Sequence, residues 1–111
     1  MRKIAARISF LSISSSAVVM AVTACVVAAP PPYEEYTLAR TAVSAAKEVD
    51  SAKNAPGFWN RAEENYRAAQ KEFKDNEFAE AKKHFLLAIQ YAEKAENATK
   101  LKKFQSGDSY P

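Results

Sequence analysis

Apolar residues follow a helical spacing of three and four positions in two neighbouring runs. The runs occupy residues 59–73 and 78–95, and their apolar members are Trp59, Ala62, Tyr66, Ala69 and Phe73, then Phe78, Ala81, Phe85, Ala88, Ala92 and Ala95. This spacing places side chains on one face of an α-helix. Because only the polar stretch 74–77 separates the runs, the sequence predicts an antiparallel hairpin in which aromatic rings pack against alanines. Its helices should run from about Pro56 or Gly57 to Lys74 and from about Glu77 to Lys103.

An alanine-rich segment before the hairpin predicts a further helix. It begins between Tyr33 and Thr37 and runs to about Asn54, where Ala55-Pro56-Gly57 interrupts the pattern. Its stripe is Ala39, Ala42, Ala46 and Val49, widened by Leu38, Val43, Ala45 and Ala52. Alanines bury little surface, so we expect this helix to detach most easily. The predicted fold class is all-α, a three-helix antiparallel bundle over residues 36–104 with a flexible tail over 105–111.

The first 24 residues have the layout of a secretory signal peptide. Basic residues at positions 2, 3 and 7 precede an apolar, serine-rich run over 8–22, and small residues lead to Cys25, the single cysteine. The run Val22-Thr23-Ala24-Cys25 resembles the lipobox of bacterial lipoproteins. That resemblance implies cleavage before Cys25 and acylation of Cys25, for example by palmitate, which would anchor the protein to a membrane. Val26 stands where an aspartate would favour the inner membrane, which implies the outer membrane, facing the periplasm.

Two other outcomes for this leader stay open. An ordinary signal peptidase could cut after Ala24 or Ala29, giving a secreted or soluble periplasmic protein. The apolar run could also remain as a membrane anchor, although it is short for a bilayer core of about 30 Å. The single cysteine favours the lipoprotein, because exported proteins rarely keep an unpaired thiol and a lipid-bearing cysteine needs no disulfide partner.

Residues 25–35 are predicted to form a tether between the lipid on Cys25 and the helices. They include three consecutive prolines at positions 30–32. Proline restricts φ and lacks an amide hydrogen. We therefore expect an extended, semi-rigid segment of about 3 Å per residue.

The positive charge of the chain belongs to its leader. Three of the 16 Lys and Arg residues lie there, whereas all 13 Asp and Glu residues follow Cys25, so the mature chain would carry no net formal charge. A nucleic-acid partner requires a surface with excess Lys and Arg, and we predict none. Along the helices, Glu63 with Arg67 and Glu96 with Lys100 have the i, i+4 spacing of weak surface ion pairs.

Residues that commonly carry chemistry are sparse. One histidine and one cysteine cannot complete a zinc site, and the two glycines, at positions 57 and 107, cannot form a phosphate-binding loop. We expect His84 to bond with Glu80, one helical turn earlier. Glu63 and Glu64 make a poor acid–base pair, since adjacent helical residues point about 100° apart. The sequence therefore predicts no catalytic residue, no cofactor and no metal site.

The hairpin resembles part of a tetratricopeptide repeat. Phe78, Ala81, Phe85 and Ala88 occupy places where the second helix of that repeat alternates aromatic residues and alanines, and no second repeat follows. From Tyr36 to Ala98 the chain more closely resembles the small exported proteins of domain of unknown function 4398. The shared features are a Tyr-x-x-Ala start, an alanine-rich first helix, an Ala-Pro break and the aromatic–alanine hairpin. Many members of this family look like lipoproteins, so the resemblance implies a lipoprotein here as well. No catalytic residue is assigned in the family, so the resemblance implies none.

Together these features predict a membrane-anchored, non-enzymatic scaffold or adaptor of the bacterial cell envelope with a protein partner. A candidate interaction surface lies near the end of the last helix, at Leu101, Lys102, Lys103 and Phe104. One alternative is a structural protein that forms homo-oligomers through alanine stripes, as a murein-type lipoprotein does. Pro56-Gly57 and Tyr110-Pro111 differ from the continuous helix and terminal lysine of that family. A role as an accessory to a cell-wall enzyme is the third possibility.

Overall fold

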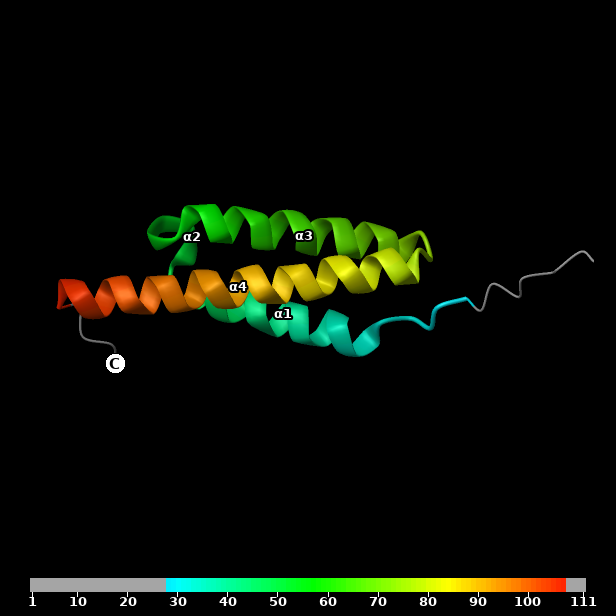
Figure 1. Ribbon diagram of the computed structural model, residues 1–111, viewed down its shortest axis with the longest axis horizontal. Coiled ribbons are helices and arrows are strands. Elements are labelled where there is room, and N and C mark those ends of the chain that lie inside the picture. Colours follow the sequence, from blue (N-terminus) through cyan, green and yellow to red (C-terminus); the bar gives the residue numbers. More distant parts are fainter. Residues whose placement is uncertain (1–27, 108–111) are drawn as a thin grey trace, which may run out of the picture.

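The computed structural model describes residues 28–107, and each regular element within that range is an α-helix (Figure 1). The helices are α1 (Tyr33–Glu48), α2 (Ser51–Asn54), α3 (Pro56–Lys74) and α4 (Phe78–Ser106). The predicted signal peptide, Cys25 and residues 108–111 of the predicted tail lie outside the described residues. The all-α fold class is confirmed over the described range.

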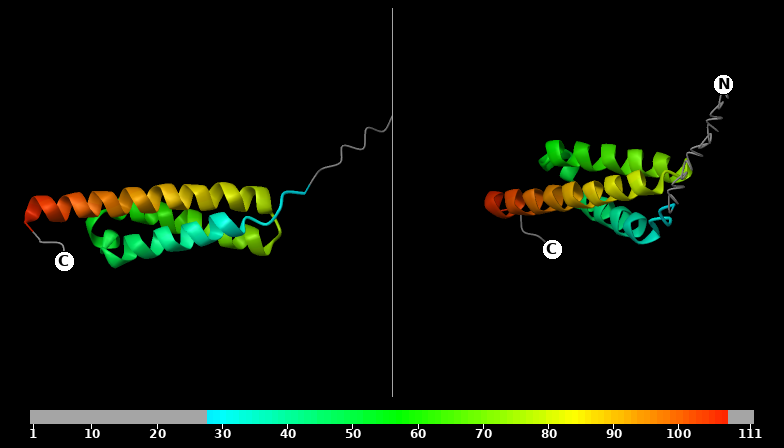
Figure 2. Two further views of the ribbon diagram at one scale, coloured as in Figure 1. Left: turned by 90° about the horizontal axis from the view of Figure 1, so that it is seen from below. Right: turned by 45° about the vertical axis from the view of Figure 1, so that its right-hand side comes forward.

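The longest helix, α4, is the centre of the arrangement. It runs antiparallel to α3 and lies between α3 and α1 in Figure 1, and both helices pack along it. The direct contact between α1 and α3 is much smaller. Figure 2 shows α1 and α3 on the same side of α4, so the three long helices have a triangular cross-section. Because α2 also packs on α4, this one helix contacts all the others.

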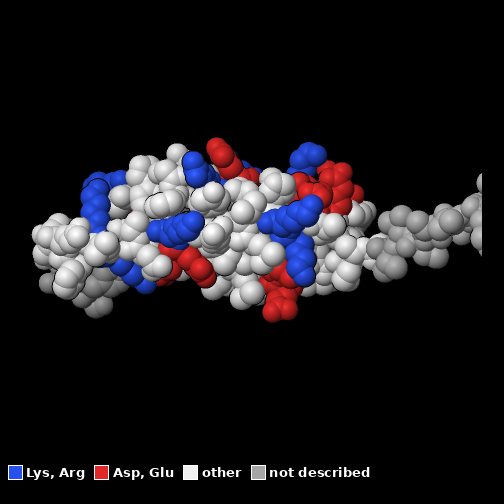
Figure 3. All heavy atoms as spheres, in the orientation of Figure 1, with Lys and Arg blue, Asp and Glu red and all other residues white. Residues whose placement is uncertain are grey.

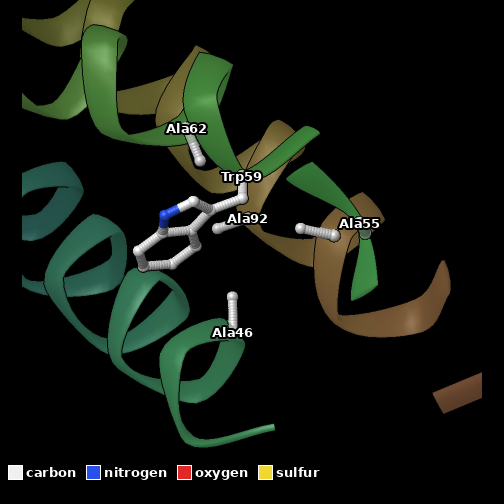
Figure 4. Packing of buried hydrophobic residues seen from close by; sticks show 6 residues of the cluster. Ala46, Ala55, Trp59, Ala62 and Ala92 are labelled. Atoms are coloured by element: carbon white, nitrogen blue, oxygen red, sulfur yellow. The ribbon is translucent and has the colours of Figure 1, made fainter. Parts of the chain in front are cut away.

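The side chains between the helices determine how closely the helices approach. Between α3 and α4 the buried side chains are mostly alanines: Ala62, Ala69, Ala81, Ala88, Ala92 and Ala95. A methyl group lets two helix axes come close together. Larger rings fill the wider space toward α1. Figure 4 shows the Trp59 ring extending from α3 toward Ala46 of α1, with Ala62 and Ala92 beside it.

A second cluster, nearer the turn between α3 and α4, is built around Phe85. Its side chain is fully buried, and its ring centroid lies 5.4 Å from Tyr36, 6.2 Å from Tyr66 and 6.4 Å from Phe73. Tilted and edge-on ring contacts of this kind are favourable. The predicted packing of rings against alanines is confirmed, because the same cluster contains Ala39, Ala69, Ala81 and Ala88.

Asn76 builds the turn between α3 and α4. Its φ is 60°, in the left-handed region that asparagine tolerates better than most residues. The next amide, that of Glu77, donates a hydrogen bond of 2.8 Å to the carbonyl of Glu72, which is the closing bond of a Schellman helix end. The predicted antiparallel hairpin is therefore confirmed, with a connection that reverses the chain within a few residues.

The first helix is shorter than predicted. It ends at Glu48 rather than near Asn54, and Asp50 has a left-handed φ of 64° before the separate helix α2 begins. This break turns Ser51 into the core, where its hydroxyl accepts a hydrogen bond of 3.0 Å from the Thr99 hydroxyl of α4. Both residues are fully buried. A contact with a distant helix thus replaces the last turn that the local pattern predicted.

Two residues assigned to the stripe of the first helix do not belong to it. Leu38 is 51% exposed, because successive residues of a helix point about 100° apart and Leu38 is turned away from the buried Ala39. Ala52, which lies in α2, is exposed as well. The buried stripe of α1 therefore consists of alanines without a leucine beside them.

The ends of the helical unit also differ from the predicted bounds. Residues 33–35 of the predicted tether are helical, and Glu34 and Glu35 lie in the first turn of α1, where negative charge is favourable. Helix α4 continues to Ser106, so Gln105 and Ser106 are helical rather than part of a flexible tail. Gly107, with a φ of 78°, ends the helix.

Replacement of Phe85 by alanine should be among the most harmful single changes. Loss of a fully buried phenylalanine ring should lower the free energy of unfolding by about 3–5 kcal/mol. Chemical denaturation followed by circular dichroism measures the difference. The adjacent Leu86→Ala is a matched control, because Leu86 is 50% exposed and its loss should cost less than about 1 kcal/mol. Equal losses in the two variants would contradict the assignment of the buried face.

The Ser51–Thr99 hydrogen bond can be tested as the contact that holds α2 on α4. Thr99→Val keeps the side-chain shape but leaves the Ser51 hydroxyl buried without a partner, at a cost of about 1–3 kcal/mol. The double variant Ser51→Ala/Thr99→Val removes both hydroxyls and should recover most of that loss. A double-mutant cycle measured by urea unfolding gives the coupling. Purely additive losses would show that this hydrogen bond does not fasten α2.

Candidate interaction surface

The C-terminal part of α4 extends beyond the other helices (Figure 1). Thr99 is its last buried residue and pairs with α2, and the residues after it project past α2. We call residues 100–106 the overhang. Its two large apolar side chains are exposed, Leu101 by 57% and Phe104 by 84%. Residues 97–106 contain no Asp or Glu and include Lys100, Lys102 and Lys103.

The four residues predicted as an interaction surface all lie on the overhang, but they do not share one face. Leu101, Lys102 and Phe104 are exposed, whereas Lys103 is half-buried. Leu101 and Lys102 follow Ala98 by three and four positions and therefore lie on the same side of α4 as Ala98. Phe104 follows Leu101 by three positions and lies beside it, farther around the helix from Lys102. Lys103 follows the buried Thr99 by four positions, so it lies on the inner side of α4. The structure thus places three of the four predicted residues on the exposed side of the overhang and Lys103 apart from them.

An open groove lies beside the overhang where α3 begins. We call it the α3–α4 groove; its volume is about 440 Å³ and its lining is Asn54, Ala55, Pro56, Gly57, Phe58, Arg61 and Ala98. The space beside Gly57 is open, since a Cβ there would meet no atom within 4 Å. The side chain of Phe58 is 40% exposed. The groove therefore offers apolar surface that α4 and the start of α3 share.

Two cations flank Tyr91 near this groove. The guanidinium carbon of Arg61 and the Nζ of Lys94 each lie 5.5 Å from the centroid of the Tyr91 ring, a favourable cation–π arrangement. In the part of the chain that the structure describes, neither cation forms an ion pair with a carboxylate. On the face drawn in Figure 3, the overhang end carries Lys and Arg atoms, while acidic atoms gather toward the middle and the opposite end.

Residue spacing alone did not predict this groove. Pro56-Gly57 carried a usable signal, because a glycine in the first turn of a helix has no side chain and leaves space beside it. The sequence pattern could not predict that Arg61 and Lys94 both lie over the Tyr91 ring, since α3 supplies one cation and α4 the other.

The chain enters the helical unit at the opposite end from the overhang (Figure 1). Pro32 is buried immediately before α1. Ala28 and Ala29 line a shallow groove together with Phe78 and other residues at the start of α4. Residues 28–32 therefore lie against the end of the bundle that contains the turn between α3 and α4.

His84 bonds with a different partner from the one predicted. Its Nδ1 lies 2.7 Å from Oε2 of Glu72 on α3. Glu80 instead pairs with Lys83 at 2.7 Å, and the hydrogen bond from Lys83 lowers the pKa of the Glu80 carboxyl. The prediction was wrong because it considered only α4, whereas His84 faces the neighbouring helix.

The other predicted pairs lie where their spacing placed them. Oε1 of Glu63 is 3.7 Å from the Arg67 guanidinium, and Lys100 pairs with Glu96. Glu64 is exposed. Within residues 28–107, no three or more His, Cys, Asp or Glu side chains gather as a metal site would require. None of the helices in this range combines the length and apolar content of a membrane span.

These observations define a small all-α unit in which α4 supports α1, α2 and α3. The family model described as Domain of unknown function (DUF4398) matches residues 34–106, nearly the whole of α1 to α4. The chain therefore belongs to this family, and the resemblance noted over Tyr36 to Ala98 is confirmed. No curated protein and no solved structure gives a significant match to the chain.

One ion pair, between Glu35 of α1 and Lys82 of α4, predicts that the attachment of α1 to α4 depends on pH. Nζ of Lys82 lies 2.9 Å from Oε1 of Glu35, and the hydrogen bond from Lys82 lowers the pKa of Glu35 below its ordinary value of 4.5. A carboxyl with a lowered folded-state pKa contributes stability above its unfolded-state pKa, and that contribution disappears as the pH falls through the folded-state value. We expect α1 to loosen at pH values below 4.5.

Hydrogen exchange of the α1 amides, corrected for intrinsic rates, measures this loosening at neutral and acidic pH. Protection in α1 should fall more on acidification than protection in α3. The Glu35→Gln variant supplies the control, because its side chain does not titrate and α1 should lose this part of its pH response. An unchanged pH response in Glu35→Gln would remove the ion pair as its cause.

Proposed function

We propose that the protein is a membrane-anchored, periplasm-facing lipoprotein that serves as a non-catalytic scaffold or adaptor in the bacterial cell envelope. One observation carries this proposal: the chain enters the helical unit at one end, and the exposed Leu101 and Phe104 of the overhang lie at the other. A lipid on Cys25 would hold the first end near the membrane. The overhang would then be presented to a protein partner.

The dimensions of the molecule suit such a role. Helix α4 has 29 residues, which at 1.5 Å per residue gives a length of about 43 Å. The segment from Cys25 to Pro32 would add about 25 Å if fully extended. A partner bound at the overhang would therefore be held several tens of ångström from the membrane surface.

The proposed location in the outer membrane depends on the leader sequence. A basic start, an apolar run and the Val22-Thr23-Ala24-Cys25 sequence together support lipidation of Cys25. Two acyl chains on the cysteine sulfur would give stable attachment, since one chain alone binds a membrane only marginally.

A homo-oligomer is the second candidate, and it would need a different surface from the alanine stripes. Those alanines are buried between the helices of one chain, so a second copy cannot reach them. Leu86 and Leu87 on α4 are 50% and 39% exposed, and they are the residues that favour self-association. Pairing through these leucines would still leave the overhang available to another protein.

Intact-mass analysis of the protein extracted from membranes tests the anchor. We expect a polypeptide that begins at Cys25 and carries the added mass of acyl chains. The Cys25→Ser variant lacks the sulfur that accepts the lipid, so it should lose both the acyl mass and the attachment to the membrane. Val26→Ala, which keeps Cys25, is the matched control and should remain lipidated.

Each other outcome identifies an alternative. An unlipidated chain cut after Ala24 or Ala29 would overturn the anchor and indicate a secreted or soluble periplasmic bundle. An unlipidated chain that retains its leader would indicate an uncleaved membrane anchor.

A further inference from the structure

We infer that the α3–α4 groove and the adjoining side of the overhang bind an acidic, apolar segment of a partner protein. This inference rests on the proposed adaptor role and names the surface and the chemistry of the partner. We call this the docking surface, and its residues are Phe58, Arg61, Lys94, Ala98, Leu101 and Lys102.

The docking surface offers cations that no carboxylate of the described chain neutralises. The charged groups of Arg61 and Lys94 lie over the Tyr91 ring, and within residues 28–107 neither of them nor Lys102 forms an ion pair with a carboxylate. Near the other end of the bundle, by contrast, three lysines already pair with carboxylates: Lys71 with Asp75, Lys82 with Glu35 and Lys83 with Glu80. Charge complementarity therefore favours an acidic partner at the overhang end.

Apolar groups make up much of the remaining docking surface. Phe58, which is 40% exposed, lines the groove together with Ala55, Pro56 and Ala98 among others. Leu101, which follows Ala98 by one helical turn, is 57% exposed. Burial of apolar partner side chains here would remove these groups from water. Acidic and apolar groups in one short segment are the chemistry that matches this surface.

The lining favours a protein over a glycan or a lipid headgroup. A glycan needs several hydrogen-bonding side chains, but the groove lining offers only two, Arg61 and Asn54, and one amide hydrogen of Asn54 is already donated to the Asp50 carbonyl, at 3.1 Å. A membrane surface is disfavoured because the chain enters the bundle at the opposite end. The occupant is therefore a segment of another protein.

The length of the uncovered part of α4 suits a short helix. Helix α3 begins at Pro56, whereas α4 continues to Ser106, so nothing in the described chain continues the line of α3 beside the overhang (Figure 1). From Lys100 to Ser106 the helix rises about 9 Å, or nearly two turns. A partner helix of two or three turns would contact the cations and the apolar groups together.

Photocrosslinking of the full-length protein in its own cells tests the docking surface. The photocrosslinking residue benzoyl-phenylalanine is placed at position 58, where it replaces one exposed aromatic side chain by another. The same side chain at position 38 is the matched control, since Leu38 is 51% exposed but lies on α1. We expect a protein adduct at position 58, and mass spectrometry should map it to a segment that combines Asp or Glu with apolar residues.

Charge reversal then separates specific docking from chance contact. In the position-58 background, Arg61→Glu with Lys102→Glu should lower the adduct yield about tenfold, because like charges placed together across an interface repel. Arg67→Glu with Lys74→Glu reverses two exposed cations elsewhere on α3 and should leave the yield unchanged. Replacing the mapped acidic residues of the partner by lysine should restore the adduct to the Arg61→Glu/Lys102→Glu protein. Circular dichroism checks that each variant remains helical.

The remaining outcomes show whether the docking surface, the adaptor role or both are wrong. A position-58 adduct that survives the Arg61→Glu/Lys102→Glu reversal, that maps to a segment without acidic residues, or that contains lipid or glycan overturns this inference. A protein adduct at position 38 without one at position 58 overturns the docking surface and leaves the adaptor role standing. Adducts at neither position overturn both.

Discussion

The close contact of alanines along α4 is the interaction on which the rest of the fold depends. The buried residues of α4 are Ala81, Phe85, Ala88, Ala92, Ala95 and Thr99. All of them are small except Phe85, which carries the one large ring in this set. Small side chains let α1 and α3 approach one common helix, while rings from α1 and α3 fill the space that remains between those two helices. Alanines contribute little buried area, so a few rings provide a large share of the stability.

The faces of the long helices could be predicted from the sequence because helical periodicity decides which residues lie side by side. Phe85 was assigned to the buried face and is fully buried. The break after Glu48 could not be predicted in this way. It places Ser51 against Thr99, where the two hydroxyls share a hydrogen bond, and these residues become neighbours only when α2 packs on α4.

The same distinction applies to the candidate site. The sequence could indicate that Leu101 and Phe104 are exposed, because the predicted last helix is longer than the helices beside it. Helix lengths can be read from the local pattern. The α3–α4 groove depends on Phe58 and Ala98 meeting across two helices, so local pattern could not reveal it. His84 shows the limit directly: its i, i+4 neighbour was Glu80, but its closest partner is Glu72 on another helix.

The break before α3 and the exposed cations have one structural origin. Because the chain turns at Asp50 and restarts its helix at Pro56, α1 and α2 end, and α3 begins, short of the C-terminus of α4. Longer neighbours would have covered Ala98 and Lys102 with further core, as they cover Ala92 and Ala95. Within residues 28–107, Leu101 and Lys102 of α4 are therefore left exposed on the side where α3 begins. The difference in helix length thus turns the end of a structural helix into a surface suited to another protein.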